Sequence, residues 1–160
     1  MPYNNPPQND GSANGLNHVP QNGGLAKSDV KEMEAYDIIE ADIRKFKLDM
    51  DPEKTYSAIA HMIKDPKYRV IRANNTLLMI ENNGDGSANG RVFTADGPNT
   101  FVKTLKQLEK ALLACGFRTM TFPSSGIAIE SLLKKAKIDY TAKPYSEDGN
   151  QGLIITVEAK

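Results

Sequence analysis

The chain has 160 residues, and twenty Lys and Arg are balanced by twenty Asp and Glu, so its formal net charge is zero. This length is typical of one domain. The zero charge argues against nucleic acid or an anionic lipid surface as the main partner, because both select a basic excess. One cysteine and two histidines exclude an internal disulfide and a metal site built on several Cys or His side chains. Neither a membrane span nor a secretory signal is expected, because apolar runs of the required length and flanks are missing.

Residues 1–27 differ in composition from the rest of the chain. Sixteen of these 27 residues are Asn, Gly, Pro or Gln. A segment of this kind buries too little apolar surface to offset the entropy lost on ordering. It predicts an N-terminal arm, either a solvated tail or a segment that orders only against a neighbouring subunit, followed by a single domain over residues 28–160.

The hexapeptide Asp-Gly-Ser-Ala-Asn-Gly occurs twice, at 10–15 and at 85–90. The second copy has part of the ligand spacing of a calcium loop that would begin at Glu81. The twelfth position of such a loop requires a bidentate Glu, and here it is Val92. A structural turn is therefore favoured, and no metal site is expected.

The elements of the first half follow from apolar spacing and turn residues. Residues 37–50 partly alternate between apolar and polar side chains, which indicates a strand with a break. Asp51 as N-cap and Pro52 at the first helical position predict a helix, which ends at 65–66. Three strands then predict an antiparallel meander, at 68–73, 76–81 and 91–94, with a Gly- and Asn-rich loop at 82–90.

The second half opens with the strongest helical pattern of the chain, and Gly116 ends it. Its apolar stripe consists of Phe101, Leu105, Leu108, Leu112 and Cys115. Cys115 is interpreted as a small buried hydrophobic residue. A strand at 117–122, a helix at 127–137 and strands at 138–144 and 152–158 complete the chain. The order β-α-β-β-β-α-β-α-β-β predicts an α+β class with a mixed sheet, in which the crossover helix makes strands 91–94 and 117–122 parallel.

This order of elements over about residues 37–158 resembles the GNAT acyltransferase fold. The resemblance is closest to small internal virion proteins of T7-like podophages. It is carried by the strings Arg91–Asp96 and Thr121–Ser125, and by an ending that runs from Tyr140 through 145–149 to 153–156. The resemblance implies a sheet of about six to seven strands with helices on both faces. It also implies a V-shaped opening between strands 91–94 and 117–122, whereas a continuous sheet would contradict it.

In active GNAT enzymes the loop before the long helix donates backbone N–H groups to the diphosphate of acetyl-CoA. The matching residues here are Asp96, Gly97, Asn99 and Thr100, interrupted by Pro98. Only Gly97 keeps the family pattern, Pro98 has no N–H, and Asp96 brings a negative charge. The family's cofactor-contacting Asn falls on Ser125 or Gly126. The resemblance therefore implies a vestigial loop and no bound cofactor.

The family's proton-donating tyrosine falls on Leu132 or Leu133, and neither side chain can donate a proton. Tyr140 and Tyr145 are the residues that could replace it from the next strand. Glu81 ends a meander strand near the usual position of a general base. His61 lies beside an apolar helix stripe, where a surface or partly packed histidine is the default interpretation. No catalytic residue is assigned, and Glu81, Tyr140 and Tyr145 remain the weak candidates.

Charge is segregated along the chain. Residues 101–143 carry eight basic and three acidic side chains, whereas residues 28–65 carry ten acidic and six basic ones. Such faces are either simply solvated or attract other protein subunits, including copies of this chain. The favoured hypothesis is thus a non-catalytic GNAT-like structural or protein-binding module, in a phage virion or the bacterial host cytoplasm. The alternatives are a divergent N-acyltransferase that uses acetyl-CoA, and a non-GNAT α+β protein with an inhibitory or accessory role.

Overall fold

The computed structural model describes residues 32–124, 129–147 and 149–160. In chain order the elements are α1 (Ala35–Lys45), α2 (Pro52–Met62), β1 (Tyr68–Ala73), β2 (Thr76–Asn82), β3 (Ser87–Thr94), α3 (Pro98–Ala114), β4 (Thr119–Ser124), α4 (Ile129–Lys135), β5 (Asp139–Glu147) and β6 (Asn150–Glu158). The predicted mixed α+β class is therefore confirmed. The predictions made for residues 1–31, including the arm, and for Ser125 and Gly126 lie outside the described residues.

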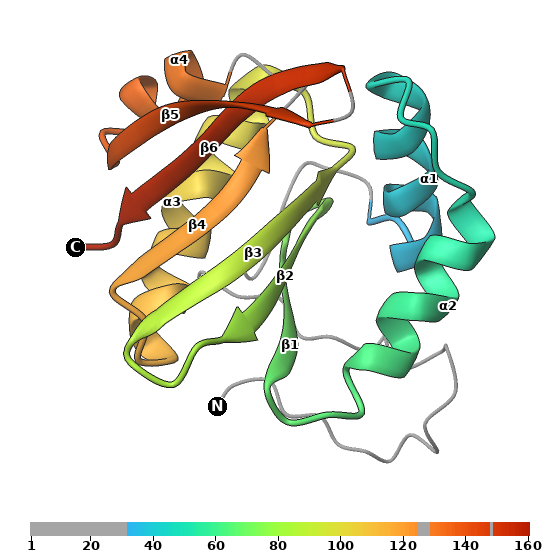
Figure 1. Ribbon diagram of the computed structural model, residues 1–160, viewed down its shortest axis with the longest axis horizontal. Helices are drawn as coiled ribbons and strands as arrows, with labels where there is room; N and C mark the ends of the chain where they lie inside the picture. The colour runs from blue at the N-terminus through green and yellow to red at the C-terminus, as the bar shows by residue number, and fades with distance from the viewer. Residues whose placement is uncertain (1–31, 125–128, 148) are drawn as a thin grey trace.

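The described strands form one six-stranded sheet in the order β1-β2-β3-β4-β6-β5. All neighbouring pairs are antiparallel except β3 and β4, which are parallel because α3 crosses from one to the other. Figure 1 shows α1 and α2 over one face of the sheet and α3 and α4 over the other. Within the described ranges, none of the helices has the length and apolar character needed to cross a membrane.

The strand predicted at 37–50 is wrong, because this segment folds as α1. Its buried positions recur every three or four residues, which is helical spacing. They are Ala35, Ile38, Ile39, Asp42 and Ile43. The apolar residues that suggested alternation continue beyond the helix end into the connection to α2, where Leu48 and Met50 pack against the same core.

The other predicted helices are confirmed at their expected places. The Asp51 carboxylate accepts hydrogen bonds from the N–H groups of Glu53 and Lys54, which begins α2. The helix α3 buries the predicted apolar stripe, and Cys115 is half-buried against that core. The strand β3 begins at Ser87, inside the segment predicted as a loop.

Two separate hydrophobic cores lie on the two sides of the sheet. The core under α3 and α4 includes Phe101, Leu108 and Leu133. The core under α1 and α2 includes Ile38, Ile59 and Phe93. Because successive strand residues face opposite sides, Val92 packs on the α3 side and Phe93 on the α1 side.

The parallel pair β3–β4 is closed at one end and open at the other. Its pairing covers three positions, from Ser87↔Thr119 to Asn89↔Thr121, although each strand continues for several residues. The two strands separate toward their C-terminal ends (Figure 1). Pairing stops at Gly90, where an ideal Cβ would lie 2.5 Å from Met120 Sδ. The β3–β4 ladder is therefore cut short, and the V-shaped opening expected from the sequence is present.

Candidate functional site

The opening between β3 and β4 exposes backbone groups that a closed ladder would pair. Ala95 N donates to Asn75 O at 2.9 Å, on the β2 side of β3. Along a strand in an antiparallel pair, N–H groups alternate between the two sides. The N–H groups of Val92 and Thr94 therefore point away from β2, into the opening. Thr94 N donates to Asp42 Oδ1 at 3.0 Å, which agrees with this direction.

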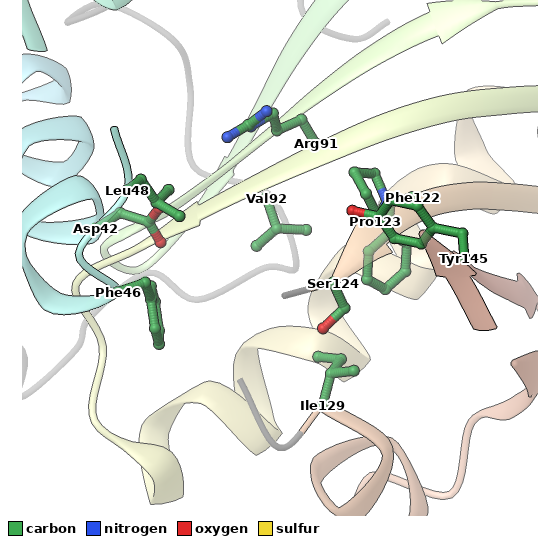
Figure 2. Close-up of a pocket in the computed structure, with 10 residues that line it drawn as sticks. All are labelled: Asp42, Phe46, Leu48, Arg91, Val92, Phe122, Pro123, Ser124, Ile129 and Tyr145. Atoms are coloured by element: carbon green, nitrogen blue, oxygen red, sulfur yellow. The ribbon is translucent and has the colours of Figure 1, made fainter. Parts of the chain in front are cut away.

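A cavity of about 130 Å³ occupies the opening. Both separated strands, α1, the start of α4 and the end of β5 contribute its walls. The lining residues are Asp42, Phe46, Leu48, Arg91, Val92, Phe122, Pro123, Ser124, Ile129 and Tyr145. Figure 2 shows Val92 near the middle of this group, with Asp42 and Tyr145 on opposite sides of it.

Asp42 is the buried carboxylate of this cavity, with an exposed fraction of 3%. Its position follows from α1, whose apolar stripe places residue 42 against the sheet. Burial raises the pKa of this carboxyl to about 6, against the lowering effects of the Thr94 N–H and of the positive charges of Arg91 and Lys45. A carboxylate with this pKa is mostly ionised at pH 7 and still basic enough to accept a proton.

Arg91 reaches the same region from β3. Its Nη2 donates to Met50 Sδ at 3.2 Å, and its guanidinium carbon lies 5.3 Å from the centroid of the Phe93 ring. Figure 2 shows Arg91 and Val92 leaving opposite faces of β3, with the guanidinium on the side of Asp42. The cavity thus receives a negative and a positive side chain from neighbouring elements.

Tyr145 is the sequence-predicted tyrosine that the structure places in the cavity. Its ring lies against Gly152, where an ideal Cβ would lie 2.8 Å from Tyr145 Cε1. Gly152 is paired with Tyr145 across β5 and β6, so the absence of a side chain there leaves the space that the ring occupies. Tyr140, five residues earlier, instead donates to Glu130 Oε1 at 3.0 Å and does not line the cavity.

Glu81 lies away from this cavity. It is paired with Tyr68 in the ladder of β1 and β2, accepts a 3.4 Å hydrogen bond from Tyr68 Oη, and lies 3.5 Å from Lys67 Nζ. His61 is exposed in the last turn of α2. The structure therefore does not bring Glu81 or His61 together with Tyr145.

The loop before α3 holds Asp96 turned into the protein interior. Its carboxylate accepts from Thr76 Oγ1 at 2.7 Å, from Asn75 N at 3.2 Å and from Thr104 Oγ1 at 3.2 Å. The sequence pattern predicts this charge beside a diphosphate, but the described partners of Asp96 are Asn75 and Thr76, at the turn between β1 and β2, and Thr104 in α3. Gly97 is the N-cap of α3 and Pro98 begins it, while Asn99 is exposed and Thr100 half-exposed.

Sequence reasoning missed Asp42. The signal was present, because an acidic residue at position 42 falls within the helical stripe formed by Ile38, Ile39 and Ile43. The segment 37–50 is predicted as a strand from the sequence, and that prediction does not single out Asp42. Within the described ranges, no group of three or more His, Cys, Asp or Glu side chains could hold a metal ion.

The sequence matches no model of a known protein family and no curated protein. Solved structures do resemble it. Salmonella typhimurium yncA, assigned as an acetyltransferase and solved with its cofactor acetyl-CoA, aligns with a TM-score of 0.53 at 12% identity, over 81% of this chain and 92% of that one. A variant of spermidine N-acetyltransferase SpeG from Vibrio cholerae gives 0.54 at 10% identity, over 81% and 94%. An aminoglycoside 6'-acetyltransferase gives 0.54 at 9%, over 83% and 98%.

These likenesses establish that the chain has the GNAT fold, as the sequence analysis expected. At sequence identities this low, a shared fold does not establish a shared activity. The expected similarity to podophage virion proteins stays a prediction.

Proposed function

We propose that the protein is an acyl-CoA-dependent N-acyltransferase, with Asp42 as the general base and Tyr145 as the proton donor. The supporting observation is that a single cavity, in the opening between β3 and β4, contains a buried carboxylate, a phenol and the Val92 backbone edge. Acyl transfer is the alternative hypothesis drawn from the sequence, and it replaces the non-catalytic module that the sequence favoured. Two findings support the change: Asp42 supplies a base, and Asp96 is turned inward.

The residues present fit an acyl-CoA at two points. The Val92 N–H points into the opening and would hold an acyl carbonyl oxygen. At the start of α3, the N–H groups of Asn99 and Thr100 have no partner within the helix and would face a diphosphate. The fit at this second point is weakened by Pro98, which has no N–H.

When bound, acyl-CoA supplies a thioester: the acceptor nitrogen bonds to its carbonyl carbon, the C–S bond breaks, and CoA leaves as a thiol. Asp42 accepts the proton that the nitrogen loses, because its carboxylate is mostly ionised at pH 7. Tyr145 donates the proton that the sulfur takes up. The apolar residues around both groups, such as Phe46 and Phe122, keep water away from the reacting atoms.

The first test is binding of acetyl-CoA to the full chain by calorimetry and thermal shift. A ligand at 100 times its dissociation constant stabilises the folded state by about 2.7 kcal/mol, which is readily measured. Binding, followed by thiol release with primary amines, is the expected result. No stabilisation at millimolar acetyl-CoA would contradict the proposal.

A non-catalytic module that binds other protein subunits, for example in a virion, is the second candidate. Two observations favour it. Leu133 is buried in the core and Leu132 packs against it, so α4 offers no tyrosine at the family's position. The start of α3 keeps only Gly97 of the phosphate-binding pattern. This candidate predicts a chain that binds no acyl-CoA and associates with itself or with another protein.

A further inference from the structure

A second hollow lies next to the cavity of Asp42 and Tyr145. It is a groove of about 310 Å³ between α2 and the strands β2 and β3. Its apolar floor consists of Met50, Ala58, Ile59, Met79 and Phe93, and Lys54 also lines it. Arg91 lines both hollows, so the groove and the cavity adjoin at this residue.

The groove floor fits a flexible or aromatic apolar group. Two of its five apolar residues, Met50 and Met79, are methionines, whose unbranched thioether chains adapt to ligands of different shape. Phe93 is buried and gives the floor a rigid flat part. Burial of an apolar ligand side chain here is favourable in proportion to the area removed from water.

The Arg91 guanidinium at the junction fits a carboxylate. Among the described residues Arg91 forms no ion pair, and the acceptor of its hydrogen bond is the weak Met50 sulfur. The Phe93 ring lies within cation–π distance of it, 5.3 Å from the guanidinium carbon to the ring centroid. A guanidinium held in this way presents parallel N–H donors, which bind a carboxylate in two-point fashion.

From this arrangement we infer the acceptor class: a free α-amino acid with an apolar side chain, such as methionine or phenylalanine. Its carboxylate binds Arg91, its side chain enters the groove, and its amine points toward Asp42. An α-amino acid carries these three groups on one carbon, and Arg91 lies where the groove meets the Asp42 cavity. The inference rests on the proposed acyl transfer for the role of the amine, but not for the binding of the carboxylate.

Initial rates of thiol release from acetyl-CoA test the inference. L-Methionine and L-phenylalanine are compared with L-methioninamide, which keeps the amine and side chain and lacks the carboxylate, and with spermidine. The expected KM for the amide is at least about tenfold higher than for the acid, since charged hydrogen bonds are lost. Equal KM values for the acid and the amide would overturn the assignment.

Variants of Arg91 provide the second arm. Arg91→Met keeps the length and removes the charge, and is expected to raise the KM for L-methionine about 10- to 100-fold and to abolish the preference over the amide. Arg91→Lys restores part of the preference. Lys64→Met, a charge loss at an exposed position beyond α2 and outside both hollows, is the matched control and leaves the KM unchanged.

Binding of the product analogue N-acetyl-L-methionine, measured by calorimetry without CoA, separates the two proposals. Binding that Arg91→Met abolishes supports the ligand class, even if no amine releases thiol and the acyltransferase itself fails. Thiol release with spermidine but none with L-methionine, and no binding of N-acetyl-L-methionine, would overturn the ligand class and leave acyl transfer standing.

Discussion

Two buried aspartates, Asp42 and Asp96, both form hydrogen bonds with Thr94. They differ in how many hydrogen bonds their carboxylates accept. Asp96 accepts hydrogen bonds from Thr76, Asn75 and Thr104. Among the described contacts, Asp42 accepts one, from Thr94 N, and its pKa is raised to about 6. The same side chain is structural where several donors satisfy it and chemically competent where burial exceeds its hydrogen bonding.

Different elements hold the two aspartates. Asp96 ties the end of β3 to the turn between β1 and β2 and to α3, within the continuous part of the sheet. Asp42 comes from α1 and caps a backbone N–H that the separation of β3 from β4 leaves without a strand partner. An interrupted ladder therefore creates the need for Asp42 and the space beside it.

The largest expected effect is on catalysis by Asp42→Asn. The amide retains the shape and can accept from Thr94 N, but it cannot accept a proton. We expect kcat/KM for thiol release to fall about 10²- to 10⁴-fold while acetyl-CoA binding persists. Asp37→Asn, at an exposed position in the first turn of the same helix, is the matched control. A rate equal to that of the unmodified protein would show that Asp42 is not the base.

The next effect is on stability. Asp96→Ala removes the shared acceptor of three buried hydrogen bonds, so we expect the free energy of unfolding in urea to fall by about 3 kcal/mol. Asp42→Asn keeps its one hydrogen bond and removes a buried charge, so it should not lose stability at pH 7. The distinction between the two aspartates would fail if Asp42→Asn were the more destabilising change.

The pH dependence of stability sharpens the same contrast. The folded-state pKa of Asp42, about 6, lies above the ordinary value of 3.8, so its stabilising contribution is present below pH 3.8 and is lost as pH rises through 6. Two pKa units correspond to about 3 kcal/mol. Relative to the unmodified protein, Asp42→Asn should therefore gain about this much between pH 3.8 and pH 7, measured by urea unfolding. A constant difference across this range would refute the raised pKa.

The smallest expected effect concerns the two tyrosines of β5. Tyr145→Phe removes the phenol that lines the cavity, and we expect kcat to fall about 10- to 100-fold, at the lower end of proton-transfer contributions. Tyr140→Phe removes a hydroxyl whose partner is Glu130, outside the cavity, and should leave kcat unchanged. Equal losses in both variants would point to a structural role for these residues.

Much of the fold could be predicted from the sequence, because most elements carry local signals. Asp51 and Pro52 begin α2, and the apolar residues of α3 recur at helical spacing on one face. The segment 37–50 failed because its apolar residues fit two periods, and the burial that decides between them depends on the sheet beneath α1. The start of β3 was missed since its Gly90 is required by contact with Met120, a residue thirty positions away.

The site was predicted less completely than the fold. Tyr145 was a candidate because tyrosine is a recognisable proton donor, and its place in the cavity depends on the pairing of β5 with β6 at Gly152. The buried position of Asp42 follows from the helical spacing of α1, and a strand prediction for this segment does not contain that spacing. The inward direction of Asp96 depends on Thr76 and Thr104, which come close to it only in the folded chain.

The most direct measurement is the pH profile of kcat/KM for thiol release from acetyl-CoA with L-methionine, for the unmodified protein and Asp42→Asn. If Asp42 is the base, the rate of the unmodified protein rises with pH through about 6, where this carboxyl loses its proton, and the variant is slow and lacks the rise. Identical profiles for the two proteins, or no thiol release with methionine or any other amine, would contradict acyl transfer by Asp42 in the opening between β3 and β4.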